Sequence, residues 1–224
     1  MNEKIFIACD SNSLKKVKKI IKETQTKKLK IGYKFGLEFI NSKKGRFFIS
    51  KIKKKIIFID AKLHDIPNTM RSTIISLKDL KINYLTVHIS AGLQALKEVK
   101  KVSGKIKIVG VTTLTSLDNK NLKEIGYNKS VKNLVIHQSK LAKKANLDAV
   151  VCSAHENKYV KKIFKKEIIT PGIRLNSISN DQKRIMTPRK AILEKKSDWL
   201  VIGRSITKGN IKKNLENLIK HLNQ

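Results

Sequence analysis

Three charged residues follow an apolar run in the segment Ile57–Thr69, which reads IFIDAKLHDIPNT. Asp60, Lys62 and Asp65 lie where a strand rich in Ile and Phe, buried on both faces, is expected to stop. Charges at the rim of a core lose hydration, and charged partners must offset that cost. An ammonium between two carboxylates also changes the proton affinity of each group. The segment is therefore either a strand-end ion pair or part of a site for proton transfer.

Two motifs near the C-terminal end of the sequence suggest a phosphate site. The first, TPGIR, ends at Arg174, and the second, VIGRSIT, contains Gly203 and Arg204. Glycine lets the backbone approach an anion closely, and arginine binds phosphate oxygens through two parallel hydrogen bonds. Each motif alone could equally be a plain turn. Because they follow consecutive strand-like runs, together they predict a phosphorylated ligand.

Short apolar runs alternate with amphipathic stretches along the sequence, which predicts a (β/α)8 TIM barrel. An open doubly wound sheet is the alternative, but its first turn is normally glycine-rich, whereas the residues after Cys9 read DSNS. The expected strands are Ile5–Cys9, Leu29–Phe35, Ile56–Asp60, Tyr84–His88, Ile106–Val111, Asp148–Cys152, Glu167–Thr170 and Trp199–Gly203. The expected helices are Leu14–Glu23, Ile49–Lys54, Thr69–Leu80, Leu93–Lys101, Val131–Ala145, Glu156–Phe164, Thr187–Lys195 and Ile211–Leu222.

No linker rich in Pro, Gly or Ser divides the chain, so we expect one catalytic domain over residues 1–224. The three prolines fall in expected loops or at helix starts, which agrees with this division. In a barrel, catalytic groups lie at the C-terminal ends of strands and in the loops that follow. The polar residues at those positions are Asp10, Lys34, Asp60, Lys62, Asp65, His88, Ser116, Arg174 and Arg204.

The net charge of +33 normally suggests a polyanionic partner. Only six of the 50 basic residues are Arg, however, and the Lys are spread over almost every helical stretch. Aromatic residues make up 5% of the chain and do not alternate with basic ones, as a base-stacking surface requires. We therefore expect a lysine-rich surface that reflects compositional drift, with some steering of a small anionic molecule, and not a nucleic-acid partner. Nucleic-acid affinity as a second property is the alternative.

No stretch of 18 apolar residues occurs, so we expect no membrane span. The apolar run Ile5–Ala8 is too short for a signal peptide and suits a first strand. Cys9 and Cys152 end strand-like runs and lack the spacing of a zinc site. We therefore expect two reduced, buried thiols and a cytoplasmic protein.

With these motifs in view, the sequence resembles the orotidine 5′-phosphate decarboxylase family nearly from end to end. The family signature DxKxxDIPNT appears as DAKLHDIPNT at residues 60–69. The other matching segments are ACD at 8–10, KFGLE at 34–38, VTTLTS at 111–116, VVCSAHE at 150–156, TPGIR at 170–174, DQKR at 181–184 and VIGRSIT at 201–207. The long signature is highly specific, whereas each of the others would be weak alone.

The resemblance implies decarboxylation of orotidine 5′-monophosphate to UMP, the last step of de novo pyrimidine synthesis, without cofactor or metal. It implies an alternating array of Lys34, Asp60, Lys62 and Asp65. Lys62 would protonate the C6 carbanion that remains when carbon dioxide leaves. Asp60 would lie beside the leaving carboxylate, and Lys34 would hold Asp60 and the ribose.

The resemblance also implies a homodimer with shared active sites, in which Asp65, Ile66 and Thr69 act across the interface. The remaining substrate contacts that it implies are Asp10 to the ribose, Ser116 and Thr115 at the pyrimidine, and Arg174, Gln182, Gly203 and Arg204 at the phosphate end. The segment 175–181, rich in Ser and Asn, suits a mobile lid.

Three alternatives stay open at this point. Sibling barrels that act on sugar phosphates share the DxKxxD strand but use a divalent metal, carry an acidic residue at the position of Lys34 and lack DIPNT. Lys30 could take the role of Lys34, although Lys34 fits the Gly-x-Glu that follows. His64 and His88 could take part in acid–base chemistry, although structural roles suit both better.

Overall fold

The computed structural model describes residues 3–175 and 186–223. Its strands are β1 (Lys4–Ala8), β2 (Lys30–Gly36), β3 (Ile56–Leu63), β4 (Tyr84–His88), β5 (Lys107–Val111), β6 (Ala149–Val151), β7 (Glu167–Thr170) and β8 (Trp199–Ile202). All neighbouring strands pair in parallel, and β8 pairs with β1 to close the barrel in sequence order. The predicted (β/α)8 barrel is therefore confirmed.

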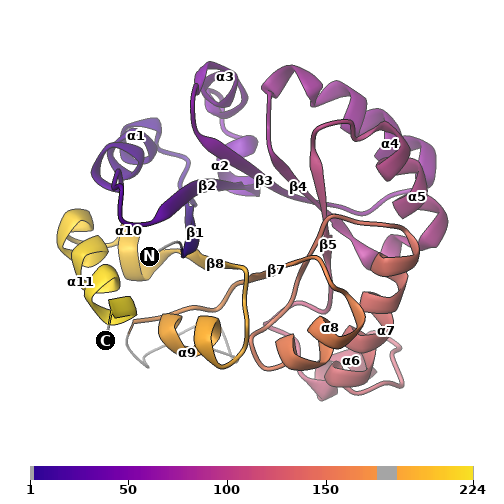
Figure 1. The fold of residues 1–224 in the computed structure, drawn as a ribbon. Coiled ribbons are helices and arrows are strands. Elements are labelled where there is room, and N and C mark those ends of the chain that lie inside the picture. Colours follow the sequence, from indigo (N-terminus) through magenta and orange to yellow (C-terminus); the bar gives the residue numbers. More distant parts are fainter. Residues whose placement is uncertain (1–2, 176–185, 224) are drawn as a thin grey trace.

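Helices cover the outside of the barrel (Figure 1). They are α1 (Leu14–Glu23), α2 (Leu37–Ile40), α3 (Gly45–Lys51), α4 (Pro67–Ser76), α5 (Leu93–Val102), α6 (Asn119–Glu124), α7 (Val131–Lys144), α8 (Asn157–Ile163), α9 (Pro188–Leu193), α10 (Arg204–Thr207) and α11 (Ile211–Asn223). Two short 3₁₀ helices, η1 (Lys78–Leu80) and η2 (Ile89–Ala91), complete the described elements.

The two faces of the strands build two separate hydrophobic clusters, because successive strand residues point to opposite faces. One cluster fills the barrel interior, and the larger one lies between strands and helices. In the interior, Phe6 stacks on Trp199 with ring centroids 4.1 Å apart. Gly32 makes room for this stack, since a Cβ there would lie 2.6 Å from the Phe6 ring. The aromatic stack thus fills part of the barrel interior.

Several predicted elements match the structure closely. The helix predicted at Leu14–Glu23 is α1 with the same bounds, and Ser13 caps it by accepting a hydrogen bond from the Lys16 N–H. The strands predicted at Tyr84–His88 and Glu167–Thr170 also have the same bounds. Both predicted thiols are buried and outside any disulfide.

Other predictions need correction. The helix expected at Ile49–Lys54 is α3, which begins at Gly45 and ends at Lys51, because Ile52 is extended. The helix expected at Thr69–Leu80 begins at Pro67 and ends at Ser76, and η1 follows it. The short helices α2, α6 and α10 were not predicted, since four to six residues carry too little periodicity to be recognised.

The most consequential correction concerns the third strand. It does not stop at Asp60 but continues to Leu63. Its pairing with β4 is irregular there, because Ile59 is opposite Leu85 and the next pair is Leu63 with Val87. Sequence reasoning ended the strand too early because it treated charged residues as incompatible with a buried strand.

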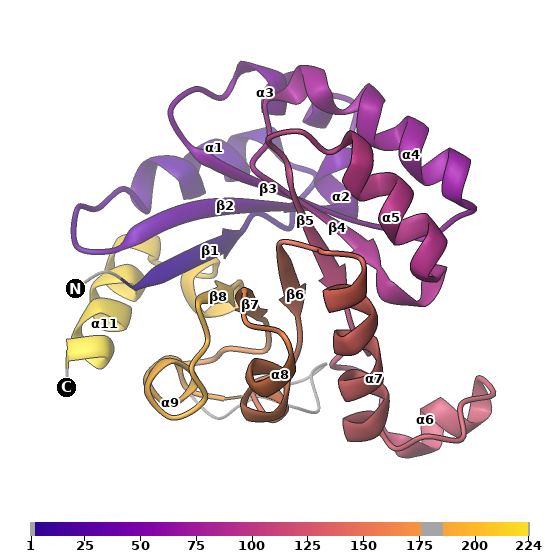
Figure 2. The same cartoon turned by 45° about the vertical axis from the view of Figure 1, so that its right-hand side comes forward.

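The segment around α6 extends away from the body of the barrel, beside the end of α7 (Figure 2). Among the described residues, no helix has the length and apolar character needed to cross a membrane.

Candidate active site

A cavity of about 710 Å³ opens at the C-terminal ends of the strands. This is the end of the barrel at which the sequence analysis placed the chemistry. Apolar residues form part of its lining, including Ala8, Phe58, Val111, Val151 and Val201. Its charged residues are Asp10, Lys16, Lys34, Asp60, Lys62, Arg174, Arg204 and Lys208.

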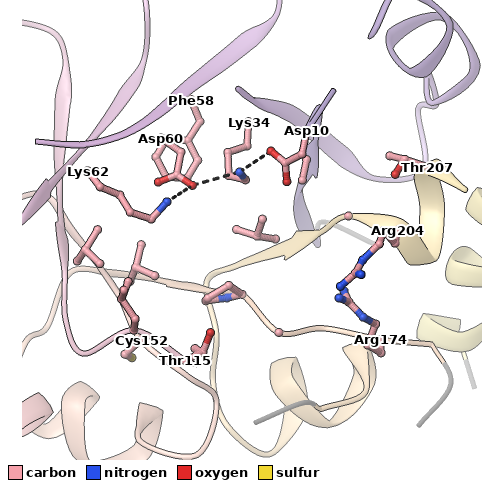
Figure 3. Close-up of a pocket in the computed structure, with 18 of the residues that line it drawn as sticks. Asp10, Lys34, Phe58, Asp60, Lys62, Thr115, Cys152, Arg174, Arg204 and Thr207 are labelled. Carbon is pink, nitrogen blue, oxygen red and sulfur yellow. Dashed lines mark hydrogen bonds and ion pairs between the residues drawn. The ribbon is translucent and has the colours of Figure 1, made fainter. Parts of the chain in front are cut away.

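Four of these charged side chains form a continuous row along one wall of the cavity (Figure 3). Lys34 Nζ lies 3.0 Å from Asp10 Oδ1 and 3.1 Å from Asp60 Oδ2. Lys62 Nζ lies 2.9 Å from the same Asp60 oxygen. Strands β1, β2 and β3 are neighbours in the barrel, so their ends bring together residues far apart in the sequence. The row alternates in charge from Asp10 to Lys62.

The centre of this row is buried, with Lys34 only 8% exposed and Asp60 9%. Burial disfavours the charged form of Asp60, but the ammonium groups of Lys34 and Lys62 outweigh it and hold the pKa of Asp60 below its usual range. Burial likewise disfavours the charged form of Lys34, but Asp60 and Asp10 raise the pKa of its ammonium above the usual value. Both groups are therefore ionised at neutral pH.

Two backbone features shape the row. Lys62 has a φ of +49°, in the left-handed region that L-residues rarely adopt. Gly36 lies beside Asp10 and Lys34, and a Cβ there would be 2.8 Å from Asp10 Oδ1. A side chain at position 36 would thus collide with the Asp10 carboxylate.

Two arginines lie across the cavity from the row, after β7 and β8, and their side chains point toward each other (Figure 3). Gly172 lies beside them with a φ of +76°, which suits glycine. Gly203 precedes α10 and also lines the cavity. Arg174 and Arg204 thus place two positive charges at the position predicted for a phosphate.

Some predicted site residues lie elsewhere in the chain. Asp65, Ile66 and Thr69 are exposed and are not among the described residues that line the cavity. The Asp65 carboxylate instead accepts a hydrogen bond from the Ile66 N–H. Thr115 lines the cavity, whereas its neighbour Ser116 is exposed and does not. Gln182 and residues 176–181 of the predicted lid at 175–181 lie outside the described residues.

The polar and charged cavity residues that sequence reasoning did not assign to the site include Lys16 in α1, Thr207 in α10 and Lys208 after it. Lys16 belongs to the first turn of the helix that follows β1. That position alone places it near the barrel mouth. Lys16 was not recognised as a site residue because lysine is abundant in this chain and an exposed helical lysine normally faces solvent.

The structure also shows where Lys30, His64 and His88 lie, the residues whose roles the sequence left undecided. Lys30 is exposed at the start of β2, paired with Lys4, and so lies at the opposite end of the strand from Lys34. His64 and His88 have ring centroids 5.4 Å apart. Burial, followed by the nearby His64 and Lys62, lowers the pKa of His88.

In the described part of the chain, no group of three or more His, Cys, Asp or Glu side chains could hold a metal ion.

Comparison with known proteins identifies the family. The family model described as "Orotidine 5′-phosphate decarboxylase / HUMPS family" matches residues 3–216. The chain belongs to this family. The orotidine 5′-phosphate decarboxylase of Wolbachia sp. subsp. Brugia malayi is 41% identical over 222 residues, covering 96% of each chain.

Two more members of the family are similar over most of their length. The orotidine 5′-phosphate decarboxylase of Wolbachia pipientis subsp. Culex pipiens is 45% identical over 183 residues, covering 79% of this chain and 80% of that one. The crystal structure of the enzyme from Lactobacillus acidophilus superposes with a TM-score of 0.85 at 29% identity, covering 99% of this chain and 100% of that one. The resemblance inferred from the DxKxxDIPNT signature is thereby confirmed.

Proposed function

We propose that this chain converts orotidine 5′-monophosphate to UMP and carbon dioxide, the last step of de novo pyrimidine synthesis, with Lys62 as the proton donor. The observation that carries the proposal is the row Asp10, Lys34, Asp60 and Lys62, which faces two arginines across a partly apolar cavity. A phosphate bound at the arginines would leave the pyrimidine ring beside the apolar part of the cavity lining, near Lys62.

The reaction breaks the bond between C6 and the carboxylate carbon. Carbon dioxide leaves, and the electron pair of that bond stays on C6 in the plane of the ring, where the ring cannot delocalise it. An ammonium fixed at this point stabilises the developing negative charge and then transfers a proton to C6. Lys62 is held for this by Asp60, 2.9 Å away. The neutral Lys62 amine then regains a proton from solvent.

Asp60 has two roles in this scheme. It orients both ammonium groups, and its own negative charge lies beside the substrate carboxylate before the bond breaks. Lys34 compensates part of that charge from 3.1 Å. The binding energy for this unfavourable approach comes from contacts far from C6, above all those to the phosphate.

The other substrate contacts follow from position. Asp10 lies just after β1, beside Lys34, and suits the ribose hydroxyls. Thr115, together with Ser116, suits the polar edge of the pyrimidine. Arg174, Gly203 and Arg204 suit the phosphate. Gln182 would be a further phosphate contact, as the family resemblance implies.

We further propose a homodimer in which Asp65, Ile66 and Thr69 of one protomer complete the site of the other. Asp65 and Thr69 are exposed, and the large apolar side chain of Ile66 is 65% exposed. A side chain of this kind is more stable when a partner covers it. Asp65 and Ile66 lie between β3, which carries Lys62, and α4, and Thr69 lies in the first turn of α4, so all three start close to an active site.

We also propose a single catalytic domain and a cytoplasmic location. Residues 1–224 act as one catalytic domain, because strands from both ends of the chain close the same barrel. The protein works in the cytoplasm, since the buried thiols of Cys9 and Cys152 are in no disulfide and suit a reducing compartment.

A direct assay tests the function against its closest alternative. Purified protein is treated with EDTA, and consumption of orotidine 5′-monophosphate is followed by ultraviolet absorbance. We expect full turnover without added metal. Activity that appears only with Mg²⁺, and only on a sugar phosphate, would assign the chain to the sibling barrels and overturn the proposal.

A further inference from the structure

The pairing of β3 with β4 is irregular at a single buried residue of β4, Thr86. Ile59 pairs with Leu85 and Leu63 pairs with Val87, so residues 60–62 of β3 all lie opposite Thr86 alone. Three residues facing one leave the backbone groups of the longer segment without regular partners. Those groups need another hydrogen-bonding partner, because they lie at the rim of the core.

The Thr86 side chain meets that need and also reaches the catalytic row. Its Oγ1 accepts a hydrogen bond from the Lys62 N–H at 2.8 Å. The same hydroxyl donates to Asp60 Oδ1 at 3.1 Å. The threonine is fully buried at 0% exposure, so neither bond competes with water. One hydroxyl thus connects the backbone of the proposed proton donor to the carboxylate that orients its ammonium.

The two oxygens of Asp60 are divided between different partners. Oδ2 contacts the Lys34 and Lys62 ammonium groups, and Oδ1 receives the Thr86 hydroxyl. A carboxylate held at both oxygens cannot rotate without losing a bond. Lys62 meanwhile keeps its strained φ of +49° while its N–H is bound to Thr86.

We propose that Thr86 is a positioning residue for the decarboxylation, which fixes the left-handed backbone of Lys62 and the orientation of Asp60. This inference rests on the proposed function. Thr86 does not line the cavity, so it acts through its two partners and not by touching substrate. Its hydroxyl sets how the proposed proton donor is held, whereas phosphate binding depends on the other side of the barrel.

The test compares Thr86→Val, which keeps the shape but removes the hydroxyl, with Thr86→Ser, which keeps the hydroxyl. We expect kcat to fall roughly 10- to 100-fold in Thr86→Val, the range for loss of a hydrogen bond to a charged group. We expect KM and UMP affinity to change little, and Thr86→Ser to restore most of kcat. A folded Thr86→Val with wild-type kcat, or a Thr86→Ser as slow as Thr86→Val, would overturn the proposal.

Thr24→Val is the matched control, because Thr24 is also fully buried and its hydroxyl lies within hydrogen-bonding distance of Ile20 O and Tyr33 OH, away from the cavity. It should lower the melting temperature without changing kcat. A similar loss of kcat in Thr24→Val would mean that Thr86→Val acts only by loosening the fold. If Thr86→Val does not fold, Thr86→Cys replaces it, since a thiol is a weaker donor and acceptor. Wild-type kcat in Thr86→Cys would then contradict the role.

A crystal structure of Thr86→Val gives a readout that does not depend on substrate. We expect Lys62 to leave the left-handed region, or its ammonium to move beyond 4 Å from Asp60. An unchanged row would contradict the positioning role even if the wild-type protein were inactive on orotidine 5′-monophosphate. Suppose instead that the wild type is inactive and that Thr86→Val loses the row. That result would contradict the proposed function but would support the positioning role of Thr86.

Discussion

Lys34 and Lys62 contact the same atom, Oδ2 of Asp60, at 3.1 and 2.9 Å. The two ammonium groups have different surroundings. Lys34 is also paired with Asp10, so two carboxylates hold it, whereas the ion pair found for Lys62 is with Asp60. The side chain of Lys62 is also more exposed, at 34% against 10% for Lys34. Lys34 therefore suits a fixed structural charge, and Lys62 suits a group that gives up a proton.

Replacing Lys62 by Ala should remove turnover while leaving UMP binding largely intact. The change deletes the proton donor but not the phosphate contacts, and general acid catalysis contributes about 100- to 10,000-fold. We expect kcat to fall by at least roughly 100-fold. Steady-state kinetics and UMP titration measure the two effects separately.

Lys54→Ala is the control for that variant, because Lys54 also has a left-handed φ, of +55°, but is exposed and does not line the cavity. It should keep the wild-type kcat. Comparable turnover in Lys62→Ala and the wild type would refute the proton-donor role.

Replacing Arg204 by Ala should mainly weaken binding of phosphorylated ligands. A charge-assisted hydrogen bond is worth about 1.5–3 kcal/mol, so we expect KM to rise about 10- to 100-fold. Arg189→Ala is the matched control, because Arg189 is exposed in α9 and outside the cavity lining. An unchanged KM in Arg204→Ala would contradict the phosphate assignment.

Mixing two inactive variants tests whether the active site is shared. In a heterodimer of Lys62→Ala and Asp65→Ala, one site combines both changes and the other is entirely native. Random assortment makes about half of the dimers heterodimers, so about a quarter of wild-type activity should return. Each variant alone supplies the background rate. No recovery after confirmed subunit exchange would rule out Asp65 acting across the interface.

The pH dependence of stability should depend on His88. Burial, His64 and Lys62 lower its pKa in the folded protein, while Asp60 opposes them. A group with a lowered pKa binds fewer protons when folded, so its contribution is present above the unfolded pKa of about 6.5 and is lost as pH falls below it. His88→Asn should therefore flatten the loss of melting temperature between about pH 7 and pH 5. His137→Asn, in α7, serves as the control, and an equal flattening there would contradict the assignment.

The sequence by itself determined the barrel and most of the chemistry. Parallel strands buried on both faces need continuous apolar runs, and these runs are visible without coordinates. The charged residues at their ends then belong to one rim, because all strands of a barrel point the same way. This argument, together with the DxKxxDIPNT signature, predicted Lys34, Asp60, Lys62 and Arg204 at the mouth.

Only the tertiary structure decided how those residues meet. The pairing of Asp10 with Lys34 depends on how β1 and β2 align, and strand register is not written in either strand alone. The irregular pairing opposite Thr86 and the left-handed backbone of Lys62 occur where the register between β3 and β4 shifts. Lys16 in the first turn of α1 lines the same cavity as residues of the last strand and of the short helix after it, a proximity that only the closed barrel creates. These contacts are between residues that are distant in the chain, so short-range patterns in the sequence cannot predict them.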